Sequence, residues 1–203
     1  MRYLTSCITC LALCVSLTGC ASDALNAEAE GTSADQNQTV VSALWAAEEV
    51  LDLGNVAAAS SDIVRGTVEA VGEPRTAVIE GGAYDGLTVV YRDAELVVTR
   101  GLKGHCASGE VISVRLLGGT VGDLTFVYEG EGDVSVGEDV SLFLTDQPDE
   151  IYPRADGFGY AIVYGVNGKF HMDGDSARRG AEVPDEYRDA SFDELVLAAG
   201  SHD

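Results

Sequence analysis

The pair His105–Cys106 is the first place in the chain where the residue types could do chemistry. An imidazole beside a thiol can help to form a thiolate nucleophile. The pair stands in Gly-His-Cys-Ala-Ser-Gly at 104–109, which is typical of a turn. Catalytic partners usually meet across a fold and not along the chain. We therefore expect a surface loop with a partly exposed thiol, open to oxidation or an intermolecular disulfide.

A second group combines one imidazole with two carboxylates, His171, Asp173 and Asp175, at alternate positions. Oxygen-rich loops of this type can hold calcium. The Ser-Ala-Arg-Arg that follows at 176–179 lacks the further acids and the distal glutamate of an EF-hand loop. The expectation is a solvated turn with no metal and no cofactor, and calcium at these three residues is the alternative.

Motifs of the common catalytic types are missing from the sequence. It contains no Gly-x-Ser-x-Gly nucleophile elbow, no Ser-x-x-Lys, and no Gly-x-Gly-x-x-Gly between a strand and a helix. We assign no catalytic residue and predict that the protein is not an enzyme.

The composition limits the partners. The chain has 203 residues, of which 34 are Asp or Glu and 12 are Lys or Arg, giving a formal net charge of -22. Such a chain repels phosphate backbones, so we predict no nucleic-acid partner. For the same reason the protein surface is a poor partner for anionic membranes. The length fits one domain with appendages.

The N-terminus has the pattern of a secretory signal peptide. Arg2 precedes an apolar run from Cys7 to Leu17, which is shorter than the about 20 residues that a spanning helix needs. Leu-Thr-Gly-Cys follows at 17–20 and resembles a bacterial lipobox. The resemblance implies cleavage before Cys20, a diacylglyceryl group on its thiol, and a lipid-anchored, extracytoplasmic location in the cell envelope. An ordinary cleaved signal or an uncleaved apolar start are the alternatives.

Cysteine usage follows from this interpretation. Cys7, Cys10 and Cys14 would leave with the signal peptide (residues 1–19), and Cys20 would carry lipid. Only Cys106 would remain, so the mature chain could form no intramolecular disulfide. The domain must then be held by its hydrophobic core.

Three further segments follow the signal. Residues 20–41 are small, polar and acidic without a periodic apolar face, and we predict a flexible tether. Residues 42–203 are predicted to form a single domain. Residues 42–53 have helical spacing, with Ser42 as a cap and Trp45 anchoring the helix on the domain.

In the rest of the chain, apolar and polar residues alternate with a period of two in short segments that are separated by Gly and Asp residues. Strands are predicted at 62–71, 87–100, 111–117, 124–129, 139–145 and 160–164, with a short one at 169–172, and loops at 73–85 and 173–188. Arg-Asp-Ala at 92–94 breaks the alternation, which predicts a bulge or bend that lets one strand serve two sides of a barrel. A turn is expected at 101–104.

The C-terminus contains a capping box, Ser191-Phe-Asp-Glu194. It predicts a helix over 191–199 that is stopped by Gly200 and docks Phe192, Leu195 and Val196 on the barrel. The fold expected from these elements is mainly β: a small OB-like, five-stranded Greek-key barrel with flanking N- and C-terminal helices.

Several short stretches occur in a familiar order: Ser-Asp-Ile-Val-Arg-Gly-Thr-Val at 61–68, Lys-Gly at 103–104, Gly-Gly-Thr at 118–120, Val-Gly-Glu at 136–138, Leu-Phe-Leu at 142–144 and Gly-Lys-Phe at 168–170. The order resembles secreted bacterial domains of unassigned function. It is also distantly similar to netrin-type and metalloproteinase-inhibitor barrels. Both resemblances imply a five-stranded barrel. Netrin-type inhibitors use a free N-terminal cysteine backed by disulfides, so no functional residue is carried over.

These observations together predict a non-enzymatic binding or interaction module, anchored to the membrane through Cys20, for an unknown protein or small-molecule ligand. The alternative is an envelope hydrolase or a protease-inhibitor-like domain. An enzyme would need a concave site with convergent polar groups and a perturbed titratable residue. A binding module would need an exposed apolar or aromatic patch.

Overall fold

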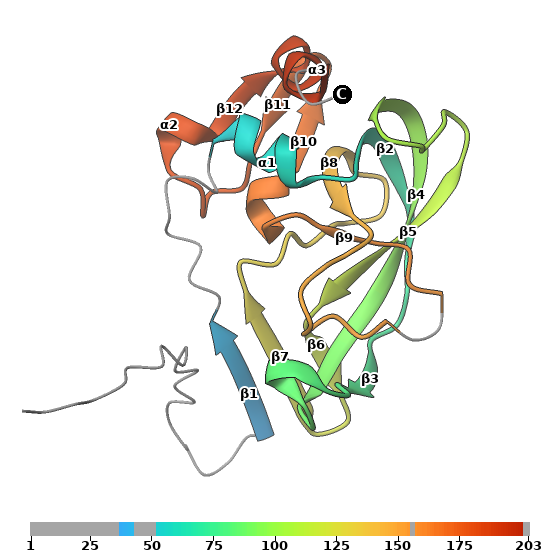
Figure 1. Cartoon of the computed structure of the whole chain (residues 1–203), viewed down its shortest axis with the longest axis vertical. Coiled ribbons are helices and arrows are strands. Elements are labelled where there is room, and N and C mark those ends of the chain that lie inside the picture. The colour runs from blue at the N-terminus through green and yellow to red at the C-terminus, as the bar shows by residue number, and fades with distance from the viewer. Residues whose placement is uncertain (1–36, 43–51, 155–156, 201–203) are drawn as a thin grey trace, which may run out of the picture.

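The computed structural model describes residues 52–154 and 157–200, together with the backbone of residues 37–42 (Figure 1). The helices are α1 (Leu53–Ala59), α2 (Asp185–Arg188) and α3 (Phe192–Gly200), with 3-10 helices η2 (Gly82–Tyr84) and η3 (Gly165–Gly168). The strands are β1 (Asn37–Ser42), β2 (Asp62–Val71), β3 (Arg75–Val78), β4 (Thr88–Lys103), β5 (Val111–Leu117), β6 (Gly119–Val121), β7 (Leu124–Glu129), β8 (Asp139–Thr145), β9 (Tyr160–Ile162), β10 (Lys169–Asp173), β11 (Ser176–Arg178) and β12 (Asp189–Ser191).

Five strands close into a barrel in the order β2-β4-β5-β9-β8 and back to β2. The pairing of β5 with β9 is parallel, and the other four pairings of the ring are antiparallel. Numbered along the chain, the ring reads 1-2-3-5-4-1, so two of its pairings, β5 with β9 and β8 with β2, join strands that are not consecutive in the sequence of the ring. This arrangement confirms the predicted five-stranded, OB-like barrel with helices at both ends.

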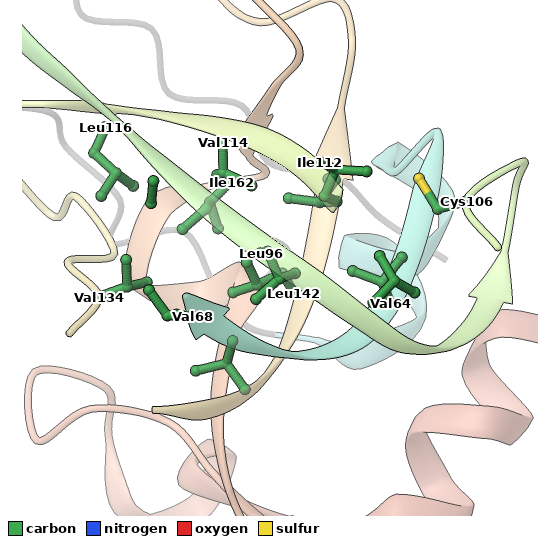
Figure 2. Packing of buried hydrophobic residues seen from close by; sticks show 14 residues of the cluster. Val64, Val68, Leu96, Cys106, Ile112, Val114, Leu116, Val134, Leu142 and Ile162 are labelled. Carbon is green, nitrogen blue, oxygen red and sulfur yellow. The ribbon is translucent and has the colours of Figure 1, made fainter. Parts of the chain in front are cut away.

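Alternation along the strands fills the barrel from the inside. Figure 2 shows Val64 and Val68 of β2 gathered with Leu96 of β4 and Leu142 of β8 in the interior. Phe143, between two inward leucines of β8, points the other way and joins a second cluster with Phe170. Both faces of β8 are therefore buried, which explains why three consecutive residues, Leu142, Phe143 and Leu144, are all apolar.

That second cluster packs α1, α3 and the β10–β11 hairpin on the outside of the barrel, at one end of the molecule (Figure 1). The predicted capping box is confirmed: the Glu194 N–H donates to Ser191 Oγ at 3.3 Å, and the Ser191 N–H donates to Glu194 Oε2 at 2.7 Å. Phe192 and Leu195 are buried in this cluster, and Val196 is partly buried against it.

The start of the domain differs from the sequence-based prediction. Most of the predicted helix over 42–53, including Trp45, lies outside the described residues. The helix that precedes the barrel is α1, capped by Asp52, whose Oδ1 accepts the Asn55 N–H at 3.0 Å. Residues 37–42 form β1, which pairs in parallel with β7, so the end of the predicted tether and Ser42 belong to a strand. The pairing of β1 with β7 therefore outweighs the polar composition of this segment, which by itself predicts a flexible tether.

The bulges also fall elsewhere than predicted. The pairing of β4 with β5 runs without a register shift through residues 92–94. Register shifts instead leave out Thr99 and Leu102 of β4 and Glu69 of β2. On the side away from β5, the strand still serves two partners in turn, because residues 88–91 pair with β3 and residues 94–103 pair with β2. It continues to Lys103, through most of the expected turn at 101–104. The expected loops at 73–85 and 173–188 contain β3, β11 and α2.

Candidate ligand-binding groove

A groove of about 470 Å³ lies between two connections of the barrel. One wall is residues 77–82, from the β2–β4 connection. The other is Glu150, Tyr152, Pro153 and Arg154, from the β8–β9 connection. In OB folds, the loops that join strands one to two and four to five help to bind oligonucleotides and oligosaccharides. The groove occupies the corresponding place and has the volume of a small-ligand site.

Arg115 holds the second wall against the barrel. This side chain of β5 is 0% exposed, and it donates from Nε and Nη2 to the two carboxylate oxygens of Asp93 at 2.7 and 3.0 Å. A third N–H donates to the Pro153 carbonyl oxygen. The guanidinium also lies over the rings of Tyr91 (4.3 Å) and Phe158 (5.5 Å). A planar cation with several donors therefore fixes two residues of the β8–β9 connection, Pro153 and Phe158.

The first wall is tied to the same cluster. Arg75 of β3 forms an ion pair with Asp93 and lies over the Tyr91 ring at 4.9 Å, so one carboxylate is shared by two guanidinium groups. Across the groove, Glu150 Oε2 accepts the Ala83 N–H at 2.8 Å. The two walls are thus joined through Asp93 and through the Glu150–Ala83 hydrogen bond, and these contacts preorganise the groove.

Tyr152 of the groove rests on a buried carboxylate. Its O–H donates to Glu131 Oε2 at 2.8 Å, and the Leu117 N–H donates to the same oxygen at 3.1 Å. The other oxygen, Glu131 Oε1, is buried without a hydrogen-bond partner among the described residues. Burial raises the pKa of Glu131 to about 7, and it raises the pKa of Tyr152 well above its ordinary value.

This environment makes stability depend on the charge of Glu131. The pKa is raised from 4.5, so the protonated form stabilises the fold fully below about pH 4.5, and this stability is lost as the pH rises through about 7. Glu131→Gln imitates the protonated form at every pH. We expect it to match the wild type near pH 4.5 and to be more stable by about 3 kcal/mol at pH 8, measured by urea unfolding.

Glu129→Gln is the control, since Glu129 is an exposed carboxylate two residues away. It should show no comparable gain at pH 8. An equal stability difference at both pH values for Glu131→Gln would contradict the assignment.

Cys106 differs from its predicted environment. The thiol was expected to be partly exposed, but the residue is buried in the barrel core, and its S–H donates to the Tyr160 oxygen at 3.4 Å. The backbone N–H groups of His105 and Cys106 donate to Asp62 Oδ1 at 2.6 and 3.3 Å, which pulls the turn inward. Burial raises the pKa of Cys106 to about 11, which opposes thiolate formation and oxidation.

The other candidate residues are not brought together. His171 and Asp173 are exposed on β10, and Asp175 is exposed in the turn to β11. His171 Nδ1 lies 3.5 Å from Glu138 Oε1. Within residues 52–154 and 157–200, no three His, Cys, Asp or Glu side chains are grouped as a metal site. Cys20 lies outside the described residues.

The Arg115–Asp93 pair and the strand β3 were not predicted from the sequence. A signal was available for the pair: Arg115 interrupts the apolar strand Val111–Leu117, just as Asp93 interrupts β4. Charges inside two neighbouring apolar strands indicate a mutual ion pair better than a bulge. The aromatic side chains are mostly used in packing, with Tyr91 and Tyr152 buried and five others half-buried: Tyr84, Tyr128, Phe158, Tyr160 and Tyr164.

Comparison with models of known protein families and with curated protein sequences finds no match. Among the helices of the described residues, none is both long and apolar enough to span a bilayer.

Proposed function

We propose that the protein is a lipid-anchored, extracytoplasmic binding module that receives its ligand in the groove between residues 77–82 and 150–154. The observation that carries the proposal is the preorganised groove at the place where OB-like barrels bind ligands, with one wall fixed by the buried Arg115.

The anchor rests on the sequence. The apolar run and the lipobox-like Leu-Thr-Gly-Cys at 17–20 support acylation of Cys20. Multiple acyl chains would hold the domain of a chain of net charge -22 at a membrane that its own surface would avoid.

A Cys20→Ser variant tests the anchor. We expect the wild type to lose residues 1–19, gain acyl mass and enter the detergent phase, and the variant to remain aqueous. Intact mass and phase partitioning are the measurements. Unchanged processing and partitioning in the variant would remove the anchor from the proposal.

Arrays of immobilised peptides and oligosaccharides test the groove, with the full-length Cys20→Ser protein as the probe. Val78 lines the groove and is 59% exposed, so Val78→Arg should fill it without disturbing the core. Val111→Arg is the matched control, because Val111 is a strand valine that is 53% exposed outside the groove. Binding should be lost only with Val78→Arg. Unchanged binding in this variant would show that the groove is not the ligand site.

One observation favours the alternative of an envelope hydrolase. Glu131 has a pKa near 7 and lines a second hollow of about 370 Å³ together with Lys169 and His171. Its Oε2, however, is occupied by the Tyr152 hydroxyl and the Leu117 amide. We therefore keep Glu131 as a support for Tyr152. Retained ligand binding in Glu131→Gln would agree with that role.

A further inference from the structure

We infer that the groove takes an extended, cationic peptide segment of a partner protein, which adds to the free edge of β3 as a further strand. The inference rests on the proposed function and specifies its ligand. Figure 1 shows β3 beside β4 at the end of the barrel opposite α1 and α3.

Half of the backbone polar groups of β3 point away from the barrel. Within the described part of the chain, β3 pairs with β4 alone. The Ile79 N–H donates to Leu87 O at 2.9 Å, whereas the oxygen of Val90, the partner of Thr76, faces β5 and accepts the Gly118 N–H at 2.7 Å. Since antiparallel ladders alternate, the N–H and C=O groups of Thr76 and Val78 point away from β4, along the edge where the groove runs.

The edge of β3 is short, at four residues, but its side chains give it little further protection. Natural edge strands are commonly shielded by a lysine, an inward charge, a proline or a covering segment. The one charged side chain of β3 is Arg75, whose guanidinium is engaged with Asp93 and Tyr91. Thr76 and Val78 are exposed. Main-chain groups of this kind are what strand addition uses for affinity.

The space beside the edge of β3 has an apolar wall. Tyr152 and Pro153, both buried, form an apolar wall that faces residues 77–79 across the groove. Arg115 holds Pro153 in place through its carbonyl oxygen. An incoming strand of about five residues could bond to Thr76 and Val78 and pack alternate side chains against this wall.

The charge of the groove selects its occupant. Glu80 and Glu150 are exposed at the groove, and Arg154 is the one cation among its lining residues, so the lining has a formal net charge of -1. A second copy of the chain would bring a further charge of -22. The N-terminal segment 20–36 has four acids and no Lys or Arg, so it is equally repelled. A peptide with Lys or Arg complements the groove.

The experiment uses three synthetic hexapeptides and the full-length Cys20→Ser protein in isothermal titration calorimetry. The probe alternates Lys and Val. One control replaces each Lys with Glu, and the other keeps the probe sequence but carries N-methyl groups on alternate backbone amides. We expect each control peptide to bind about tenfold more weakly or worse, because it loses charge complementarity or main-chain hydrogen bonds. Binding of the probe should weaken with added salt.

The protein variant that isolates the edge is Val78→Pro. It removes an outward N–H without removing a bond to β4, and proline is tolerated at strand edges. Val111→Pro is matched, because the register of β5 also directs the Val111 N–H away from β4. Only Val78→Pro should weaken binding of the probe, again by about tenfold. Glu80→Lys provides a variant that leaves the backbone intact, and it should reverse the preference between the Lys and Glu peptides.

The outcomes separate the two proposals. Equal binding of the N-methylated peptide, or a ligand blocked by Val78→Arg but indifferent to Val78→Pro and Glu80→Lys, would overturn strand addition and leave the groove intact. Ligand binding that is indifferent to Val78→Arg would overturn the groove itself. Edge-to-edge dimers in sedimentation, abolished by Val78→Pro, would make a second copy the occupant and overturn the cationic peptide.

Discussion

Arg115→Met should destabilise the protein by about 3–5 kcal/mol, because it removes one partner of a buried ion pair. Arg115 is fully buried and gives two hydrogen bonds to Asp93 and one to the Pro153 carbonyl oxygen. Methionine has a similar reach but no donors, so the Pro153 oxygen and part of the Asp93 carboxylate lose their partners. Arg75 still contacts Asp93, which places the expected loss toward the lower end of this range.

The substitution should also affect the groove, because the wall at residues 150–154 loses its attachment to β5. Urea unfolding measures the stability, and titration with the Lys–Val peptide at a temperature where the variant is folded measures the groove. We expect weaker peptide binding in the folded variant.

Arg92→Met is the matched control. Arg92 is the neighbour of Asp93 on β4, and its ion pair with Asp133 at 2.5 Å involves a carboxylate that is largely exposed. Exposed pairs contribute about 0–1 kcal/mol, so this variant should stay close to the wild type. A loss of less than about 1 kcal/mol in Arg115→Met would contradict the role assigned to the buried cluster.

Gly66→Ala should destabilise the barrel by about 3 kcal/mol or more, through overpacking. Gly66 lies in β2 between its two partner strands, opposite Val98 of β4 and Val140 of β8. A Cβ there would lie 2.5 Å from the Val97 carbonyl oxygen and 2.9 Å from Leu96 Cγ. The carbonyl belongs to the β2–β4 ladder, so it cannot retreat without loosening the barrel.

Gly200→Ala is the control for the same chemical change. Gly200 is the last residue of α3, and a Cβ there would meet nothing within 4 Å. Alanine should be neutral or slightly stabilising at that position. The urea midpoints of unfolding of the two variants test this prediction. Equal midpoints would show that β2 and β4 have room to separate.

Local patterns in the sequence determined much of the barrel. The strands 111–117, 124–129 and 139–145 were predicted with the bounds that the structure has, because apolar runs end there at glycine-rich turns or at short polar segments. The start of α3 was also predictable, since a capping box needs only four neighbouring residues. The lipobox resemblance at Cys20 is another property of consecutive residues, and it stays a prediction.

Only the tertiary structure decided the environment of single side chains. Arg115 and Asp93 are 22 residues apart, and their charges are tolerated inside apolar strands because antiparallel pairing places them opposite each other. Cys106 is buried because Asp62, far away in the sequence, accepts the backbone N–H groups of its turn. The free edge of β3 exists because the ring closes through β9 and leaves β3 outside it. Each of these features depends on contacts between segments that are distant in the sequence. A local pattern of residues cannot predict the free energy of such contacts.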